Sequence, residues 1–456
     1  MIGTVSLQEV QKKTGGVLSG DASFSAVSID TRTLQPGDLF VALKGPNFNG
    51  NEFVARATEQ KASAVVVSED VETTLPMLKV DDTRKALGLI GNLNRSLASA
   101  CVIALTGSQG KTSVKEMTAS ILGECGNVMM TQGNLNNDLG VPLSLSRIVE
   151  DNDFSVIEMG ANGPGEIAYM VGLAQPRIGH ITCIAGTHLE GFGDLDGVAR
   201  AKGEIWQGIE EDGIAIVNLD DAYAPQFIEQ INQQAGNRTV VTVSGHGKPD
   251  ADYRASNIEM KALEGIRFVL ESQRGNAEIS LTVPGHHNVS NALAAAAMAM
   301  SAGAELQHIK AGLEKYTPVK GRMCMVKGVS GSTVIDDTYN ASPSSFRAAI
   351  DVLTNSSGKT IVVMGDMAEL GAEEESSHRE VGAYAREQGV EVFIAVGELS
   401  RMAVQAYGEG GVFLENRDGF LTLIAPLLDE STTVLVKGSR SQSMEELVAQ
   451  IKEEIE

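Results

Sequence analysis

Between residues 101 and 220, short unbroken runs of apolar residues alternate with segments whose apolar positions recur every three or four residues. Unbroken runs are typical of strands buried on both faces, and the three-to-four-residue recurrence is typical of helices. The expected strands cover residues 101–105, 127–131, 154–159, 178–186 and 214–220, and the expected helices cover 112–125, 140–149 and 196–213. This alternation predicts a parallel sheet with helices on both faces.

The central region ends in a different pattern. Two strand-like runs at 266–272 and 277–283 are separated by a four-residue turn, which predicts an antiparallel hairpin at the edge of the sheet. An alanine-rich helix is expected at 288–303, before a boundary segment near residue 315.

Two further α/β units flank the central region. Before residue 80, short apolar runs at 25–30, 38–43 and 62–68 are separated by turn residues and by one helical segment at 51–60. Beyond residue 315, expected strands at 332–337, 359–366, 390–397 and 432–438 alternate with expected helices at 344–355, 377–389 and 443–454. This last unit is Rossmann-like, but no G-x-G-x-x-G follows its first strand, so no dinucleotide site is predicted. We therefore predict an α/β protein of three domains, at residues 1–80, 81–314 and 315–456.

The chain of 456 residues carries a formal net charge of -23 and is 43% hydrophobic. This balance disfavours binding to nucleic acid or acidic membranes, and any phosphate site must be locally basic or assisted by a metal. No signal-peptide pattern and no run of about 18 apolar residues occurs, which predicts a cytoplasmic protein without membrane insertion. The four cysteines form no C-x-x-C pair, so we expect buried free thiols.

Residues 104–113, with the sequence ALTGSQGKTS, join the first central strand to the next helix. The usual phosphate loop reads G-x-x-x-x-G-K-[ST], but the position five before Gly110 holds Leu105. We interpret Leu105 as part of the strand, which leaves a shorter phosphate turn from Thr106 to Thr112. Lys111 would reach the β- and γ-phosphates of a nucleotide, and the Thr112 hydroxyl would bind Mg²⁺. The alternative is an ordinary glycine turn with an exposed lysine.

Three other polar residues are candidates for the same site. Glu158 closes an apolar strand, and strand ends beside a phosphate loop are where an open α/β sheet binds its ligand. A carboxylate there is a candidate Mg²⁺ ligand, with a solvated strand end as the alternative. His188 is expected in a loop and Lys202 on a helix. From the residues alone, both are more typical of a protein surface than of a catalytic group.

Seven motifs, in order along nearly the whole chain, together resemble the Mur ligases of peptidoglycan synthesis. They are TGSQGKTS (106–113), GNLNNDLGVP (133–142), IEMGA (157–161), HLEGFGDLDGVARAKGEI (188–205), GHHNVSNALAA (285–295), DDTYNASPSS (336–345) and KGSRSQSMEEL (437–447). The resemblance implies an N-terminal domain that takes the UDP end of the substrate, a central ATP-binding domain, and a C-terminal domain that binds the acceptor and part of ATP.

The resemblance is closest to the members that add D-alanyl-D-alanine to UDP-N-acetylmuramoyl-tripeptide. It implies that the tripeptide carboxylate attacks the γ-phosphate of ATP to give an acyl phosphate, and that the dipeptide amine then displaces phosphate. The product would be the UDP-muramoyl-pentapeptide precursor of peptidoglycan, made by a cytoplasmic monomer. Whether the third peptide residue is lysine or diaminopimelate stays open.

The resemblance also implies roles for individual residues. Lys111, His188 and Lys202 would be catalytic. Thr112 and Glu158 would hold one Mg²⁺, and His188 with a carbamylated Lys202 would hold a second. The residues implied to bind ATP are Thr106, Gly107, Ser108, Gln109, Gly110, Lys111, Thr112, Ser113, Asn288, Asn291 and Arg322, with Asp336 or Asp337. Those implied to bind the UDP-muramoyl substrate are Thr31, Arg32, Asn134 and Asn137.

The sequence departs from the family pattern in two places. Asn49 and Asn51 stand where the family often has Asp-Gly-His, and Ser342 stands where Asn is usual. The DNPR stretch of the relatives that add lysine or diaminopimelate is absent, which disfavours that branch.

Three rival interpretations fit less well. A folylpolyglutamate synthase would carry its phosphate loop near the N-terminus, whereas here the loop begins only at residue 106. A non-catalytic nucleotide-binding protein would have lost the candidate metal and acyl-transfer residues, which are all present. An unrelated kinase or GTPase of the P-loop class is disfavoured by the missing first glycine and by the large closing domain.

Overall fold

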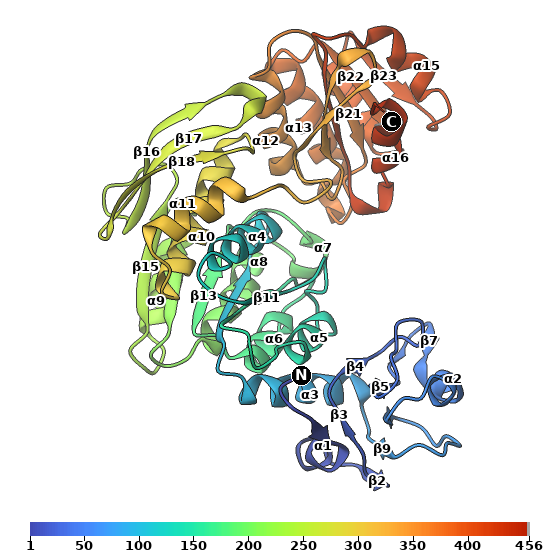
Figure 1. Ribbon diagram of the computed structural model, residues 1–456. Coiled ribbons are helices and arrows are strands. Elements are labelled where there is room, and N and C mark those ends of the chain that lie inside the picture. Colours follow the sequence, from blue (N-terminus) through green and yellow to red (C-terminus); the bar gives the residue numbers. More distant parts are fainter. Residues whose placement is uncertain (454–456) are drawn as a thin grey trace.

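The computed structural model of this chain describes residues 1–453. The end of the predicted third domain and the last residue of the predicted helix 443–454 lie outside the described residues. Figure 1 shows three large sheets, of five, nine and six strands, that follow one another from the blue N-terminal end to the red C-terminal end, each with its own helices. The mixed α/β architecture agrees with the prediction.

The N-terminal sheet has five short strands, and the three apolar runs predicted before residue 80 all form strands in it. Their order is β2 (Val17–Ser19), β9 (Met77–Lys79), β8 (Ala64–Val67), β5 (Leu39–Val41) and β4 (Val27–Ser28), with helices α1 (Leu7–Thr14) and α2 (Val54–Glu59) beside them. The long helix α3 (Thr83–Leu97) was not predicted. Its Ala86, Leu87 and Ile90 pack into the N-terminal core, so α3 connects this unit to the central one.

The central sheet has nine strands, and seven neighbouring strands in it, β11 to β16 in the order below, are mutually parallel. In spatial order the nine are β11 (Val128–Met130), β12 (Phe154–Glu158), β10 (Cys101–Thr106), β13 (Ile178–Ile181), β14 (Ile214–Asn218), β15 (Thr239–Ser244), β16 (Tyr253–Met260), β17 (Ile266–Ser272) and β18 (Gly275–Leu281). The hairpin β17–β18 is antiparallel, as predicted, and β17 also pairs antiparallel with β16.

Helices cover both faces of the central sheet, as the unbroken apolar runs predicted. Along β10, Ile103 and Leu105 point into a core shared with α4 (Lys111–Leu122) and α10 (His286–Ser301). Val102 and Ala104 point into the opposite core. That second core is built by helices α5 (Gly140–Ser146), α6 (Glu166–Ala174), α8 (Leu195–Gly203) and α9 (Ala224–Asn232), while α11 (Leu306–Lys315) joins the first.

The C-terminal sheet is parallel except for its first strand. Its order is β19 (Cys324–Lys327), β20 (Thr333–Asp337), β24 (Thr433–Lys437), β21 (Thr360–Gly365), β22 (Val392–Val396) and β23 (Gly411–Leu414). Helices α12 (Pro343–Thr354), α13 (Glu374–Glu387), α14 (Ser400–Tyr407), α15 (Phe420–Ile424) and α16 (Glu445–Ile451) surround it. This is the Rossmann-like arrangement that was predicted.

Two expectations from composition meet the structure here. None of the helices within residues 1–453 is long and apolar enough to cross a membrane. All four cysteines are free, as expected, but none is fully buried: Cys101, Cys183 and Cys324 are partly exposed, and Cys125 is exposed. The reason is local: α4 ends at Leu122, and Cys125 lies in the turn beyond it, outside the core that α4 builds.

Candidate functional site

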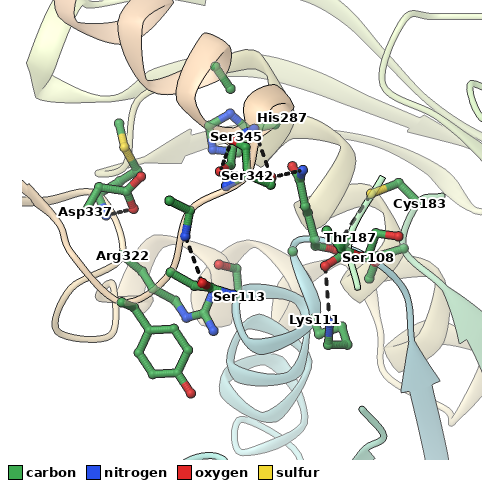
Figure 2. Close-up of a pocket in the computed structure, with 18 of the residues that line it drawn as sticks. Ser108, Lys111, Ser113, Cys183, Thr187, His287, Arg322, Asp337, Ser342 and Ser345 are labelled. Carbon is green, nitrogen blue, oxygen red and sulfur yellow. Dashed lines mark hydrogen bonds between the residues drawn. The ribbon is translucent and has the colours of Figure 1, made fainter. Parts of the chain in front are cut away.

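A cavity of about 960 Å³ lies between the central and C-terminal sheets. Side chains and backbone of the phosphate loop, the ends of β12 and β20, and the starts of α10 and α12 line it. Figure 2 shows Ser108, Lys111 and Ser113 on one side of this space and Ser342, Ser345 and Asp337 on the other. A site built from two domains in this way can close around a ligand and exclude water.

The phosphate loop has the shortened form expected from the sequence. Leu105 is fully buried in β10, in register with Glu158 of β12, so it belongs to the strand. Gly107 has a φ of 141° and Gly110 a φ of 76°. A Cβ atom would lie 2.0 Å from the Thr182 Oγ1 at Gly107 and 2.6 Å from the Asn291 Oδ1 at Gly110. Both glycines are therefore required by conformation and by space.

Helix α4 begins at Lys111, directly after this turn. The Lys111 ammonium donates hydrogen bonds to the carbonyls of Gly107 (2.7 Å) and Ser108 (3.3 Å), and so lies folded over the loop. Burial lowers the pKa of Lys111, and the nearby Glu158 carboxylate acts in the opposite direction. An ammonium and the free N–H groups of a helix N-terminus together suit a bound phosphate.

Glu158, at the end of β12, is 2% exposed. Its Oε1 accepts a hydrogen bond from the Asn136 amide (2.7 Å), whereas its Oε2 is buried without a hydrogen-bond partner, 4.0 Å from the Lys115 ammonium. Mg²⁺ prefers oxygen ligands of this kind, because a buried carboxylate oxygen without a hydrogen-bond partner has a free lone pair. The phosphate loop and α4, the helix that carries Thr112, lie beside it. The sequence did not identify Asn136 or Lys115 as supports of this carboxylate.

The donor set fits Mg²⁺ held jointly with a nucleotide. Within residues 1–453, no three His, Cys, Asp or Glu side chains gather as a metal cage of their own. Mg²⁺ commonly binds through one or two carboxylates together with the phosphates of its substrate, so no such cage is required.

The residues alone had suggested that Lys202 lies on a solvated helix face, but the structure buries it. It is 1% exposed, it donates a hydrogen bond to the Ala161 carbonyl (3.2 Å), and its ammonium lies 5.2 Å from the centre of the Phe192 ring. Burial first, and then the charge of Lys111, lower the pKa of Lys202 to about 7. In a large fraction of the molecules, the Lys202 side chain is therefore a neutral amine at neutral pH.

His188 lines the cavity from the loop after β13 and contacts the C-terminal domain. Its Nδ1 lies 2.6 Å from the Oε2 of Glu369, which the sequence did not identify as part of the site. Burial is the largest cause of a lowered pKa at His188, opposed by Glu369 and reinforced by Lys111 and Lys202.

Asn288 and Asn291, both implied to bind ATP, lie in the first turns of α10 and line the cavity. The Asn291 amide donates to the Asn288 Oδ1 (3.1 Å), and the Asn288 amide donates to the Pro284 carbonyl (2.7 Å). This pairing fixes both side chains, and it places Asn291 against Gly110 of the phosphate loop.

The C-terminal candidates separate into two groups. Arg322 and Asp337 line the cavity. The Arg322 guanidinium lies 4.1 Å from the centre of the Tyr339 ring, and Asp337 pairs with the Lys437 ammonium at 2.6 Å. Asp336 does not line the cavity, because its carboxylate is buried and accepts a hydrogen bond from the Thr338 hydroxyl. Of the two aspartates left open by the sequence, only Asp337 faces this space.

The candidate substrate residues are divided between two places. Asn134 and Asn137 line the cavity, and the side-chain Oδ1 of Asn137 also accepts from the backbone N–H of Gly140 at the start of α5 (2.9 Å). Thr31 and Arg32 do not line it, because they lie in the N-terminal domain, where Arg32 pairs with Asp30. The remaining candidates outside the lining are Thr106, Gly107, Thr112 and Lys202.

Comparison with known families identifies the chain. Three family profiles match it in order: "Mur ligase family, catalytic domain" over residues 23–95, "Mur ligase middle domain" over 105–299, and "Mur ligase, glutamate ligase domain" over 321–440. The chain therefore belongs to the Mur ligase family.

Particular members of the family resemble the whole chain. The UDP-N-acetylmuramoyl-tripeptide–D-alanyl-D-alanine ligase of Escherichia coli (strain K12) is 44% identical, over 99% of both chains. A crystal structure of MurF from Acinetobacter baumannii matches with a TM-score of 0.91 at 34% identity, over 98% of both chains. The MurF ligase of Thermotoga maritima, solved in complex with ADP, shares the fold with a TM-score of 0.83 at 23% identity, covering 93% of this chain and 96% of that one.

Proposed function

We propose that this chain is an ATP-dependent ligase that joins D-alanyl-D-alanine to UDP-N-acetylmuramoyl-tripeptide. The observation that carries the proposal is that the phosphate loop and Glu158, whose Oε2 has no hydrogen-bond partner, line one interdomain cavity. This site belongs to a chain that matches a ligase of that name over 99% of both lengths. The product is the UDP-muramoyl-pentapeptide precursor.

The chemistry requires two transfers. A terminal carboxylate oxygen of the tripeptide attacks the γ-phosphorus of ATP, the bond to the β-phosphate oxygen breaks, and ADP leaves. The free amine of D-alanyl-D-alanine then attacks the acyl carbon, the C–O bond to phosphate breaks, and the nitrogen loses a proton. Both steps bring anions together, so the protein acts mainly by positioning the reactants and neutralising charge.

Lys111 and the start of α4 neutralise the transferred phosphoryl group. Thr112 and Glu158 would hold the Mg²⁺ that accompanies ATP, and this ion supplies further positive charge at the phosphates. Asn288, Asn291, Arg322 and Asp337 would hold the rest of the nucleotide, and Asn134 and Asn137 would hold the muramoyl part of the substrate. The UDP end would extend to Thr31 and Arg32 in the N-terminal domain. The division of the chain into domains at residues 1–80, 81–314 and 315–456 stays a prediction.

Lys202 is suited to a second metal role through its chemistry. As an ammonium it cannot bind a cation, but a neutral amine attacks CO₂, which forms an N–C bond and releases one proton. The carbamate so formed is an anion whose oxygens would join His188 as ligands of a second Mg²⁺. The lowered pKa of about 7 and the burial of the side chain support this step. The cytoplasmic location and the monomeric state remain predictions.

Phosphate release by the purified protein tests the proposal. Each UDP-muramoyl precursor is offered with ATP and with D-alanyl-D-alanine, D-glutamate or a diamino acid. We expect turnover only when a tripeptide precursor and D-alanyl-D-alanine are present together. Lys111→Ala should abolish it, and Lys310→Ala, on an exposed lysine of α11, should not. Turnover only with D-glutamate or a diamino acid would reject the assignment.

A further inference from the structure

The contact between His188 and Glu369 joins two domains at the edge of the cavity. His188 precedes the short helix α7 (Leu189–Phe192) of the central domain, and Glu369 lies in the loop after β21 of the C-terminal domain. The imidazole Nδ1 and the carboxylate Oε2 are 2.6 Å apart. Directly beside them, Gly371 approaches Glu190, so the two loops meet over more than one residue.

Both residues of this pair hold a backbone conformation that L-residues seldom adopt. His188 has φ 53° and ψ 37°, and Glu369 has a φ of 65°. Such conformations are energetically unfavourable and persist where the surroundings impose them, often at functional sites.

The Glu369 loop is held firmly by its own domain. The backbone N–H of Met367 donates to the His378 Nε2 (2.9 Å), and the backbone N–H of Ala368 donates to the Ser439 hydroxyl (2.9 Å). Glu369 is thus presented by a fixed segment, although its side chain is 56% exposed. Substituting this side chain therefore removes little buried packing.

We propose that Glu369 is a positioning residue, which orients His188 for the second cation and thereby makes that site complete only when the C-terminal domain is closed. The inference rests on the proposed function. A carboxylate that accepts a hydrogen bond from the Nδ1–H keeps the proton on Nδ1, which leaves the lone pair of Nε2 free, and it fixes the plane of the ring. When the C-terminal domain moves away, His188 loses this partner.

The competing explanation is that the contact only holds the two domains together, and the chain offers a matched control for it. Gln109 and Ser344 form a second hydrogen bond between the same two domains, away from His188. Glu369→Ala and Ser344→Ala each remove one interdomain contact, but only the first removes the partner of His188. Glu369→Gln retains an oxygen that accepts from Nδ1–H, and tests for rescue.

The experiment counts Mn²⁺ ions bound to the full-length protein by electron paramagnetic resonance, at a concentration of a non-hydrolysable ATP analogue that saturates every variant. We expect two sites in the unsubstituted protein, weakening of one of them about 10-fold or more in Glu369→Ala, partial recovery in Glu369→Gln, and no change in Ser344→Ala. In kinetics, kcat should fall in Glu369→Ala while the KM for ATP changes little.

Three results would overturn the inference: a single Mn²⁺ site in the unsubstituted protein, unchanged Mn²⁺ binding in Glu369→Ala, or equal weakening in Ser344→Ala. Because Mn²⁺ binding needs no acceptor and no turnover, it is read independently of the substrate assignment. A wrong assignment would instead appear as missing phosphate release by the unsubstituted protein.

Discussion

The side-chain amide of Gln109, in the middle of the phosphate loop, donates a hydrogen bond to the hydroxyl of Ser342 at 2.8 Å. These residues are 233 positions apart, and they join the central domain to the C-terminal domain. Ser342 is also the N-cap of α12, since its hydroxyl accepts from the backbone N–H of Ser345. Figure 2 shows Ser342 and Ser345 facing the phosphate loop across the cavity. A movement of α12 therefore acts directly on the loop expected to hold ATP.

This contact predicts that Gln109→Ala weakens ATP binding more than it slows the reaction. A neutral hydrogen bond contributes about 0.5–1.5 kcal/mol, so the KM for ATP should rise roughly 2- to 10-fold with a smaller change in kcat. Steady-state kinetics would measure both. Ser344 accepts a second hydrogen bond from the same Gln109 amide, so Gln109→Ala and Ser344→Ala form a double-mutant cycle for the contact of this amide with the C-terminal domain. Strictly additive effects of the two substitutions would contradict a shared role of this contact.

Much of the fold could be predicted because apolar burial in a parallel sheet leaves a clear local pattern. The run at 101–105 became β10, and its in-register pairing with β12 brought Glu158 beside the phosphate loop, as expected from the carboxyl ends of parallel strands. The hairpin β17–β18 could be predicted equally well, because its two apolar runs and its turn lie next to each other in the sequence.

Contacts between domains could not be predicted in this way. Glu369 and Ser342 meet His188 and Gln109 only through the packing of the C-terminal domain, and no local periodicity encodes that packing. The burial of Lys202 could not be predicted from the sequence either. It lies on a charged helix segment, yet the fold encloses it against Phe192, which only the tertiary structure could reveal.

The buried Lys202 predicts a chemical rescue. Lys202→Ala should lower kcat by about 100-fold or more, because both the carbamate and its metal ligands are lost. Added acetate or propionate should restore part of the activity by placing carboxylate oxygens in the vacated space. Phosphate release at increasing acid concentration would measure this, with Lys310→Ala as an exposed-lysine control. Full activity of Lys202→Ala without any acid would disprove the carbamate.

Glu158 predicts a change in the magnesium requirement. Glu158→Gln keeps the size of the side chain but removes the charge from the unpartnered Oε2, so the Mg²⁺ concentration for half-maximal rate should rise roughly 10-fold or more. Titration of Mg²⁺ at saturating ATP would measure the shift. Glu124→Gln, which replaces a glutamate just past the other end of α4, is the control and should titrate like the unsubstituted protein. An unchanged titration of Glu158→Gln would argue against its role as a ligand.

His180 predicts how the stability of the central domain depends on pH. Its ring is buried in β13, with Nδ1 3.0 Å from the Ile216 carbonyl and Nε2 without a partner, and burial lowers the pKa of His180 to about 4. Between pH 4 and the ordinary histidine value of about 6.5, the unfolded state therefore binds more protons than the folded state, and stability must fall as the pH decreases. Each unit in this window changes the free energy of unfolding by up to about 1.4 kcal/mol.

The single tryptophan allows the pH dependence of stability to be measured in the central domain. Trp206 is fully buried in the central domain and packs against Gly179, next to His180. Urea unfolding followed by Trp206 fluorescence should give midpoints that fall from pH 6.5 to pH 4 in the unsubstituted protein. In His180→Gln, which retains a hydrogen-bond donor but cannot gain this proton, the curve should be flatter over the same range, although the variant is less stable overall. Parallel curves for the two proteins would show that another group controls the acid sensitivity of this domain.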